Sequence, residues 1–429
     1  MRRTASRLFA AMLAVVCTGG LWAAETPVFK AMPAKKISAR AGIGHVMAKI
    51  RAGQEVTVAY LGGSITAANG WRPKTTAWLQ KTFPNATFKE IHAAIGGTGS
   101  NLGVFRVGRD ALQYNPDLLF VEFAVNDGSA APESIWRSME GIVRQTWRKD
   151  PRTDIVFAYT IHKSMIDEVK QGSCPRSASA MEMLADFYGI PSVNFQVPVV
   201  ELLQQDKLAF QADKKPDAGR IWFTTDGCHP RDEGHEIYLK LMAEALTQMQ
   251  DSRSADHQAQ LAKTFVADHW EAAKMVPLNA KMLSGNWRPL PAEDGKQKSF
   301  GKRMGQIWTA NQPGSKVHFK FKGSIASLYD LVGPDGGQVV ITVDGKQGAK
   351  PAPRFDSYCT YHRIASLSLA SNVDPNQIHE VTVEIHPEQP DRKSVAFRLK
   401  DPEKELQGPK FQGTNVWASQ LMLLGDLVE

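Results

Sequence analysis

Cysteine is scarce in this chain, which has only four among its 429 residues. They are Cys17, Cys174, Cys228 and Cys359, and neither a CxxC pair nor the His/Cys spacing of a zinc site accompanies them. The sequence therefore predicts neither a cysteine-stapled scaffold nor a structural metal, and no metal ligand is expected in the functional site. If two of the cysteines pair, we expect Cys174 with Cys228.

Long apolar runs and basic clusters are also missing. The apolar run at 8–17 is too short to span a membrane, so stable membrane insertion is not expected. The net charge of +7 is a mild excess, and no Lys/Arg cluster with interleaved aromatic residues is present. Nucleic-acid binding is therefore not expected, and the sequence indicates no particular protein partner.

The first 24 residues are typical of a signal peptide for export. Three arginines flank or precede the apolar run at 8–17, and small residues follow it at 19–24. We expect cleavage after Ala23 or Ala24. The mature protein is then expected in the periplasm or outside the cell.

Residues 39–250 alternate short β-rich runs with amphipathic segments, which is typical of βαβ units. Apolar residues at helical spacing predict helices around 135–146 and 237–249. The predicted fold class is therefore α/β, a flavodoxin-like three-layer α/β/α sandwich with a parallel sheet. The expected strands are Val56–Leu61, Thr87–Ile91, Leu118–Phe123, Ile155–Tyr159 and Ser192–Phe195.

The composition changes after Gln250. A polar stretch leads into a segment rich in Pro, Gly and Trp, so 251–295 is expected to be a linker. Alternating runs then predict an antiparallel β-sandwich or jelly-roll domain over 296–429, with turns such as Asp344-Gly345 and no helix. The expected strands are Lys316–Phe321, Ser324–Leu331, Val339–Val343, His379–Ile385 and Ser394–Leu399.

A serine follows the first expected strand in the motif GGSIT at 62–66. Glycines at the end of a strand allow a tight turn that presents a side-chain oxygen at the sheet edge, where Ser64 could act as a nucleophile. The motif is not GxSxG, so the nucleophile elbow of α/β-hydrolases does not apply. A purely structural turn is the alternative interpretation.

The motif DGCHP at 226–230 lies just before the last expected helix. A serine nucleophile needs a base that takes its proton, and a histidine base needs a carboxylate that fixes its tautomer. The spacing of Asp226 and His229 lets one short loop supply both groups. A capping aspartate beside a surface histidine, or two metal ligands, are the alternatives.

Two further motifs follow strand ends: Gly96-Gly97 after the second expected strand and AVND at 124–127 after the third. Acyl transfer needs donors for the developing oxyanion, and the backbone N–H groups of Ser64 and Gly97 with the Asn126 amide could supply them. Because ligands bind at the carboxyl ends of parallel strands, these groups are expected at one edge. A loop glycine and a turn asparagine are the alternatives.

The four motifs resemble, in chain order, the blocks that define the SGNH (GDSL-like) hydrolases. This resemblance covers about 39–250 and implies a serine esterase with Ser64 as nucleophile, His229 as base and Asp226 as its orienting acid. It also implies an oxyanion hole formed by Ser64, Gly97 and Asn126, and a reaction without metal or organic cofactor.

Two positions depart from the family pattern: Gly63, where many members have Asp, and Ala124, where many have Gly. Neither is a reacting group, although Ala124 narrows the space beside the expected oxyanion hole. The C-terminal part is similar to β-sandwich modules attached to bacterial carbohydrate esterases of this superfamily. Core packing and glycan binding both remain open for its distinctive stretches at 328–334 and 356–361.

Substrate contacts are less clear from the sequence. Trp71 and Arg72, just after the nucleophile turn, could contact a sugar, and His162 follows the fourth expected strand. A core role for Trp71 and a structural role for His162 are the alternatives.

We therefore expect an exported serine esterase that removes acyl groups, chiefly O-acetyl groups, from an acetylated glycan. The alternatives are a lipid or thioester hydrolase, an O-acetyltransferase using the same residues, and a non-catalytic glycan-binding protein with the same fold.

Overall fold

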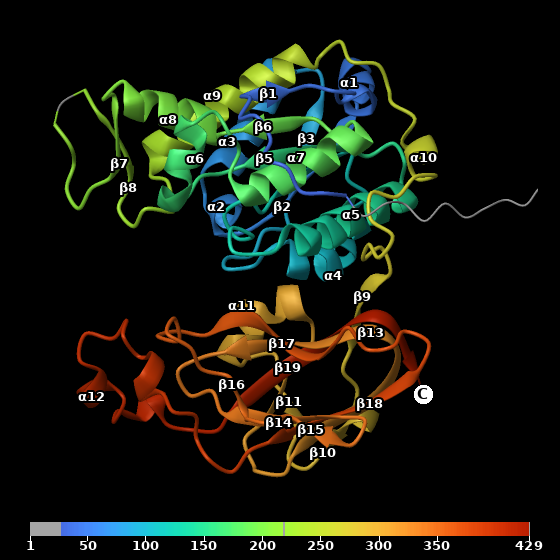
Figure 1. Cartoon of the computed structure of the whole chain (residues 1–429), viewed down its shortest axis with the longest axis vertical. Helices are drawn as coiled ribbons and strands as arrows, with labels where there is room; N and C mark the ends of the chain where they lie inside the picture. Colours follow the sequence, from blue (N-terminus) through green and yellow to red (C-terminus); the bar gives the residue numbers. More distant parts are fainter. Residues whose placement is uncertain (1–26, 218, 429) are drawn as a thin grey trace, which may run out of the picture.

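The structure is a computed structural model and describes residues 27–217 and 219–428. The expected signal peptide, residues 1–24, lies outside these ranges. The described chain forms an N-terminal α/β domain and a C-terminal β domain, which Figure 1 shows one above the other. Within the described ranges, no helix has the length and apolar character needed to cross a membrane.

A six-stranded sheet is the framework of the N-terminal domain. Five strands run parallel in the order β6-β5-β4-β2-β3, and β1 joins antiparallel beside β6, just before residue 39. This is the flavodoxin-like order, which confirms the expected fold class and the five expected strands. The strands are β1 (Ile37–Ser38), β2 (Glu55–Gly62), β3 (Thr87–His92), β4 (Leu118–Glu122), β5 (Asp154–Tyr159) and β6 (Ser192–Asn194).

Both faces of this sheet are apolar and covered by helices. In β2, Val58 and Tyr60 pack in one hydrophobic cluster, while Ala59 and Leu61 pack in the other, because successive side chains point to opposite faces. The helices on the first face are α1 (Gly44–Arg51), α3 (Trp71–Thr82), α8 (Gln196–Gln204) and α9 (Asp232–Gln248). Those on the second face are α4 (Ser100–Asp110), α5 (Pro132–Lys149) and α7 (Arg176–Tyr188). The two helices expected from spacing are α5 and α9.

The C-terminal domain is a large antiparallel sheet that folds around its own apolar core, as expected. Its strands are β9 (Ala273–Pro277), β10 (Leu283–Ser284), β11 (Arg288–Pro289), β12 (Trp308–Ala310), β13 (Lys316–Val332), β14 (Gln338–Val343), β15 (Lys346–Gln347), β16 (Ala352–Pro353), β17 (Arg363–Ser371), β18 (Ile378–Ile385) and β19 (Val416–Val428). The short helices are α11 (Gly295–Met304) and α12 (Pro402–Glu405). The turn expected at Asp344-Gly345 joins β14 to β15, with positive φ angles of 51° and 76°.

This domain differs from its expected outline in several places. It contains the helices α11 and α12, although no helix was expected, and the strand expected at 394–399 is absent, since Lys393–Val395 form a 3₁₀ turn. The segment 251–295 is not only a linker, because β9 pairs with β19 and begins the second sheet at Ala273. The two strands expected at 316–321 and 324–331 are one long strand, β13, which runs through Gly323. A Cβ at Gly323 would collide with the backbone of Leu424, so glycine is required where β13 and β19 approach closely.

The cysteines do not pair as expected. Cys174, Cys228 and Cys359 are all free thiols, so the expected disulfide between Cys174 and Cys228 is wrong. The Cys174 thiol is buried and lies 3.5 Å from the carbonyl oxygen of Pro33 and from Nδ2 of Asn194. Cys174 packs in the hydrophobic cluster on one face of the sheet, whereas Cys228 packs against the cluster on the other face, so the two thiols lie apart.

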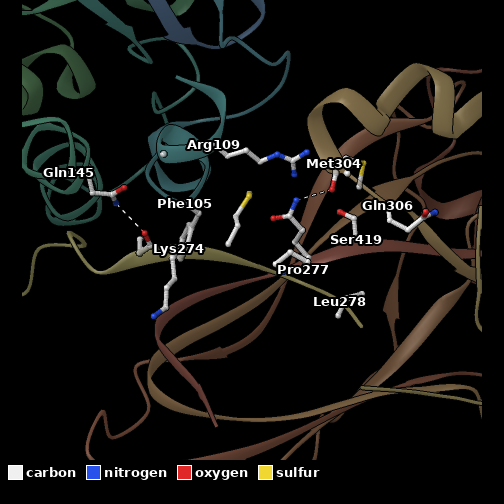
Figure 2. Close-up of a pocket in the computed structure, with 14 residues that line it drawn as sticks. Phe105, Arg109, Gln145, Lys274, Pro277, Leu278, Met304, Gln306 and Ser419 are labelled. Atoms are coloured by element: carbon white, nitrogen blue, oxygen red, sulfur yellow. Dashed lines mark hydrogen bonds between the residues drawn. The ribbon is translucent and has the colours of Figure 1, made fainter. Parts of the chain in front are cut away.

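One hydrophobic cluster spans both domains. It joins Phe105 of α4 to Trp417 of β19, and Figure 2 shows Phe105 and Met304 lining a cavity between the domains. On the same border, Nε2 of Gln145 donates a hydrogen bond to the carbonyl oxygen of Ala273 at 3.2 Å. The C-terminal domain is therefore packed against α4, the helix that directly follows the expected oxyanion loop.

Candidate active site

The expected nucleophile lies at the carboxyl end of β2. The strand ends at Gly62, and Ser64 is the first residue of the short helix α2 (Ser64–Ala67), where it is half-buried. A Cβ at Gly62 would lie 2.8 Å from the carbonyl oxygen of Glu122, and one at Gly63 would collide with the Asn126 side chain. Both glycines are thus required by the close approach of β4 and its following loop to the serine turn.

The DGCHP loop brings a histidine and a carboxylate to the same place. It follows β8 (Ile221–Thr224), which pairs with β7 (Leu208–Gln211), and it precedes α9. Nε2 of His229 lies 2.8 Å from Oγ of Ser64, and Nδ1 of His229 lies 2.6 Å from Oδ2 of Asp226. The structure therefore brings the three expected residues into one hydrogen-bonded chain, with both distances in hydrogen-bond range.

The Asp226 carboxylate is held by the loop itself. Its Oδ1 accepts hydrogen bonds from the backbone N–H groups of Cys228 at 2.9 Å and His229 at 2.8 Å. Partial burial opposes ionisation, but the hydrogen bonds from the His229 ring and from the two backbone N–H groups prevail and lower the pKa of Asp226 to about 2. An ionised Asp226 fixes a proton on Nδ1 of His229 and leaves Nε2 to accept one from Ser64.

The two expected oxyanion donors flank the serine. An ideal Cβ at Gly96 would lie 3.6 Å from the Ser64 Cβ, so the Gly96-Gly97 loop is in van der Waals range of the nucleophile. Gly97 has a φ of +72°, a left-handed conformation that favours glycine. On the other side, the Asn126 side chain lies against the backbone of Gly63. The structure therefore brings Gly97, Asn126 and Ser64 together at one edge, as expected.

Asp127 links the two loops that carry the expected oxyanion donors Gly97 and Asn126. Its Oδ1 accepts a hydrogen bond from the backbone N–H of Ser100 at 3.0 Å, which ties the loop after β4 to the start of α4. Burial raises the pKa of Asp127 to about 6, although the hydrogen bonds from Ser100 oppose the rise. Asp127 is the last residue of the AVND motif, for which the sequence predicted a role of Asn126 alone.

A buried glutamate stabilises the serine turn through hydrogen bonds. Glu122, at the end of β4, accepts hydrogen bonds from the hydroxyl groups of Thr66 at 2.7 Å and Thr160 at 2.6 Å. Burial raises its pKa, while the hydrogen bonds from Thr160, Thr66 and the Gly63 backbone oppose the rise. Sequence reasoning missed Glu122, although a glutamate inside the apolar run LLFVEF at 118–123 is a signal that could have found it.

Arg106 joins the carboxyl end of β2 to the Gly97 loop. Its side chain is fully buried on α4 and donates hydrogen bonds to the carbonyl oxygen of Gly62 at 3.0 Å and to Oγ1 of Thr98 at 3.4 Å. It also forms an ion pair with Asp110 at 3.0 Å. Nothing in the sequence distinguishes Arg106 from a surface arginine, so only the structure shows that it braces the loop.

Two of the expected substrate contacts are wrong. Trp71 is fully buried among the rings of Tyr60, Phe120 and Phe195, so it cannot contact a ligand. Arg72 is also buried: it donates to the carbonyl oxygen of Thr66 and pairs with Glu90. The helix α3 turns both side chains inward, because its N-terminal turn packs on the sheet.

His162 remains near the site. It lines a cavity of about 640 Å³ with Asn126 and Arg176, and its Nδ1 lies 2.8 Å from Oγ of Ser164. A second cavity of about 280 Å³ lies beside the Gly97 loop, and Arg363 of the C-terminal domain also lines it. The side chains of His45, Asp154 and His257, which could hold a metal ion, lie at the opposite edge of the sheet, where β5 begins.

A doubly wound α/β domain with a Ser-His-Asp hydrogen-bonded chain at the carboxyl ends of its strands is an arrangement of serine hydrolases. Residues 60–237 match the model of the GDSL-like Lipase/Acylhydrolase family. The N-terminal domain is therefore a GDSL-like acylhydrolase domain, which places it among the carboxylic ester hydrolases.

The whole described architecture is similar to two crystal structures of a two-domain esterase (CEX) active on acetylated mannans. One, co-crystallized with mannopentaose, has a TM-score of 0.67 and 20% identity, with 90% of this chain and 94% of that chain covered. The other has a TM-score of 0.68 and 19% identity, with 90% and 95% covered. At these identities the likeness establishes the two-domain fold. No curated protein matches the sequence.

Proposed function

We propose that the protein is an exported serine esterase that removes acyl groups, chiefly O-acetyl groups, from polysaccharides or oligosaccharides. The hydrogen-bonded chain from Ser64 through His229 to Asp226 is the observation that carries this proposal. Export to the periplasm or the cell exterior is part of the proposal and rests on the signal sequence at 1–24.

In the proposed mechanism, Ser64 Oγ attacks the ester carbonyl while His229 Nε2 takes its proton. The ionised Asp226 stabilises the imidazolium that forms. His229 then gives this proton to the leaving alcohol, which is a sugar hydroxyl, and the acyl group stays on Ser64. A water molecule that His229 deprotonates attacks the acyl-enzyme and releases the acid, which restores the serine.

The proposed oxyanion hole consists of the backbone N–H groups of Ser64 and Gly97 and the amide of Asn126. Donors fixed in place before the reaction need no reorganisation when negative charge develops on the carbonyl oxygen. The link from Asp127 to α4 and the contacts of Arg106 hold the two loops that carry these donors. Every step is thus assigned to side chains and backbone groups of this chain.

An acetylated glycan fits the surroundings of the proposed site. Asp226 and His229 are each about half exposed, so a long polymer can reach the triad without entering a tunnel. The cavity where Gly97 meets the C-terminal domain is also lined by Asp356 and Arg363, partly exposed charged groups that suit sugar hydroxyls better than acyl chains. The structurally similar two-domain esterase is active on acetylated mannans, which agrees with this substrate class.

The C-terminal domain is proposed to contribute to glycan binding beside this cavity. Tyr358 is 49% exposed, and its ring lies 3.8 Å from the guanidinium carbon of Arg398 and 5.7 Å from that of Arg363. An exposed aromatic ring held in place by two cations offers a flat apolar surface for a sugar ring. Arg363 lines the cavity itself, so this surface continues toward Gly97.

The first test measures acetate release from a panel of acetylated polysaccharides, with a long-chain ester as the contrasting substrate. The wild type should release acetate, and Ser64→Ala should lower kcat by about 10⁴-fold or more while the fold is retained. The matched control is Ser299→Ala, an exposed serine on α11, which should keep wild-type rates. Wild-type rates in Ser64→Ala would overturn the mechanism, and preference for the long-chain ester would favour a lipid hydrolase.

A second test concerns the C-terminal surface. Tyr358→Ala should raise KM for the polysaccharide several-fold and leave hydrolysis of a small acetate ester unaltered. The control is Tyr114→Ala, which removes a tyrosine of similar exposure, 41%, from the N-terminal domain. Equal effects of the two variants on polysaccharide KM would remove Tyr358 from the proposed binding surface.

A further inference from the structure

A cluster of two histidines and one aspartate lies at the edge of the parallel sheet opposite Ser64. His45 is in the first turn of α1, Asp154 begins β5, and His257 begins α10 (His257–Gln260). One possible ligand atom from each residue lies within 4.8 Å of the others. In Figure 1, α1 and α10 lie near one another on the right of the N-terminal domain, away from α2.

Each histidine ring is already oriented by a backbone carbonyl group. Nε2 of His45 lies 2.8 Å from the carbonyl oxygen of Ala255, and Nδ1 of His257 lies 2.9 Å from that of Pro151. A nitrogen that faces a carbonyl must carry the proton, so the lone pair is on the other nitrogen of each ring. The His257 ring is also stacked on Trp147 at a centroid distance of 4.5 Å. Metal-binding histidines have this kind of support.

Asp154 supplies an unpartnered oxygen between these rings. The residue is 1% exposed, and its Oδ2 accepts a hydrogen bond from the backbone N–H of Val46 at 2.8 Å. Its Oδ1 is buried and has no hydrogen-bond partner among the described residues. The distance from this Oδ1 to Nε2 of His257 is 3.9 Å, which is too long for a hydrogen bond. A buried carboxylate oxygen in this state lacks the cation or donor that would compensate its desolvation.

We propose that His45, Asp154 and His257 form a binding site for a divalent first-row transition metal ion, with zinc as the probe. Imidazole nitrogen and carboxylate oxygen are ligands that zinc accepts at about 2.0–2.2 Å. Two ligands of a tetrahedral ion at these bond lengths lie about 3.3 Å apart, so the 3.9 Å between Asp154 and His257 closes by about half an ångström on binding. The separations that involve His45, which are within 4.8 Å, close by at most about 1.5 Å.

The surroundings leave room for entry and for a fourth ligand. His45 also lines an open cavity of about 370 Å³, whose other charged residues are Lys49, Asp117, Asp150 and Arg152. Lys49 is paired with Asp117 and Arg152 with Asp150, so these four charges compensate one another. A water molecule from this cavity can complete the coordination, since the chain supplies only three ligands in the cluster.

The position of the cluster assigns the ion a structural role. It would join α1 and β5 to α10, which belongs to the segment that leaves the N-terminal domain and enters the second sheet at β9. The ion would therefore fix the path of the chain between the domains. Sequence reasoning predicted no metal, because the three ligands are far apart in the chain and none follows a familiar zinc spacing.

The test uses the full-length protein, stripped by a chelator and titrated with zinc against a chromophoric competitor. We expect one tightly bound zinc ion per chain, and a rise in Tm of about 5–10 °C when free zinc is a hundredfold above Kd. Anomalous diffraction at the zinc edge should place the ion between His45, Asp154 and His257. This measurement needs no variant, so it stays decisive if a substitution prevents folding.

Variants supply the second readout. Asp154→Asn and His45→Gln should each lose the stoichiometric zinc and the Tm rise. The matched control His269→Gln, which changes another half-buried histidine of the same connecting segment, should keep both. Absence of stoichiometric zinc in the wild type, an ion located elsewhere, or equal binding in all three variants would each overturn the proposal.

Discussion

The two edges of the parallel sheet carry the same pair of residue types in opposite environments. At the carboxyl edge, Asp226 and His229 are joined by a 2.6 Å hydrogen bond and are half exposed, and the pKa of Asp226 is lowered to about 2. At the amino edge, Asp154 and His257 are buried and 3.9 Å apart, and burial raises the pKa of Asp154 to about 7.

This difference shows that burial and hydrogen bonding, and not residue type, decide what an Asp-His pair can do. Backbone N–H groups and solvent keep Asp226 ionised, so it can orient a base. The Oδ2 atom of Asp154 accepts a backbone hydrogen bond, whereas its Oδ1 has no partner among the described residues, so this carboxylate is suited to a cation. The experiments below probe this contrast.

The largest expected effect comes from Asp226→Asn. An asparagine in this position keeps the loop geometry but favours the wrong tautomer of His229, so kcat on a small acetate ester should fall by about 10⁴-fold. The control Asp232→Asn alters an exposed aspartate at the start of α9 and should have no comparable effect. Steady-state kinetics on both folded variants decides the matter, and a fall of less than tenfold would remove Asp226 from the triad.

A smaller loss is expected from Asn126→Ala at the same edge. Loss of one oxyanion donor should lower kcat by about 10²–10³-fold and change KM much less, because the interaction strengthens only as charge develops. Tm should stay near the wild-type value. If Asn126 only braces the loop, both constants and Tm should change together, and that result would contradict its role as a donor.

Removal of metal should affect stability through the amino edge without affecting the reaction at the carboxyl edge. A chelator should lower Tm by several degrees and leave kcat on a small acetate ester unchanged at a temperature well below Tm, because the His45, Asp154 and His257 cluster lies away from Ser64. Zinc should restore the Tm. Parallel loss of kcat and Tm would show that the amino-edge cluster is coupled to the chemistry.

The smallest effect concerns pH and two aspartates of the carboxyl edge. Asp226 has a folded pKa of about 2, below the unfolded value of about 3.9, so its contribution to stability is present above pH 4 and is lost as the pH falls toward 2. Asp127 has a folded pKa of about 6, so stability should decrease as the pH rises from 4 to 6.

Measurement of Tm from pH 2 to 7 tests both predicted directions of the pH dependence of stability. Asp226→Asn should flatten the curve below pH 4, and Asp127→Asn should flatten it between pH 4 and 6. Since Asp127 is buried at the same carboxyl edge as Asp226, its pH dependence separates the effect of burial from the effect of position. Curves that run parallel to the wild type over both windows would contradict the assigned pKa shifts.

The sequence was most informative where function depends on strand ends. Ser64, Gly97 and Asn126 each follow a strand of a parallel sheet, so a correct strand assignment was enough to place them at one edge. It was less informative for Trp71 and Arg72, because the direction in which α3 turns its first residues depends on packing. The His45 and His257 contact depends wholly on tertiary structure.

In the C-terminal domain, local patterns were less reliable. The alternation at 394–399 predicted a strand, but the segment forms a 3₁₀ turn and leaves Phe397 73% exposed. The strand β19 was missed because most of its residues are buried on both faces, which removes the alternation that marks a strand. The helix α11 was missed too, since Met304 is its single buried residue.

The hydrophobic cluster that joins Phe105 to Trp417 has a consequence for protein engineering. A truncation after Gln250 would leave the outer side of α4 in water, and this helix also carries Arg106, which braces the Gly97 loop. The C-terminal domain therefore cannot be deleted or exchanged as an independent domain on a flexible linker could be. A chimera with another C-terminal domain must also adapt the surface of α4 that faces it, or the loops of the proposed active site lose their support.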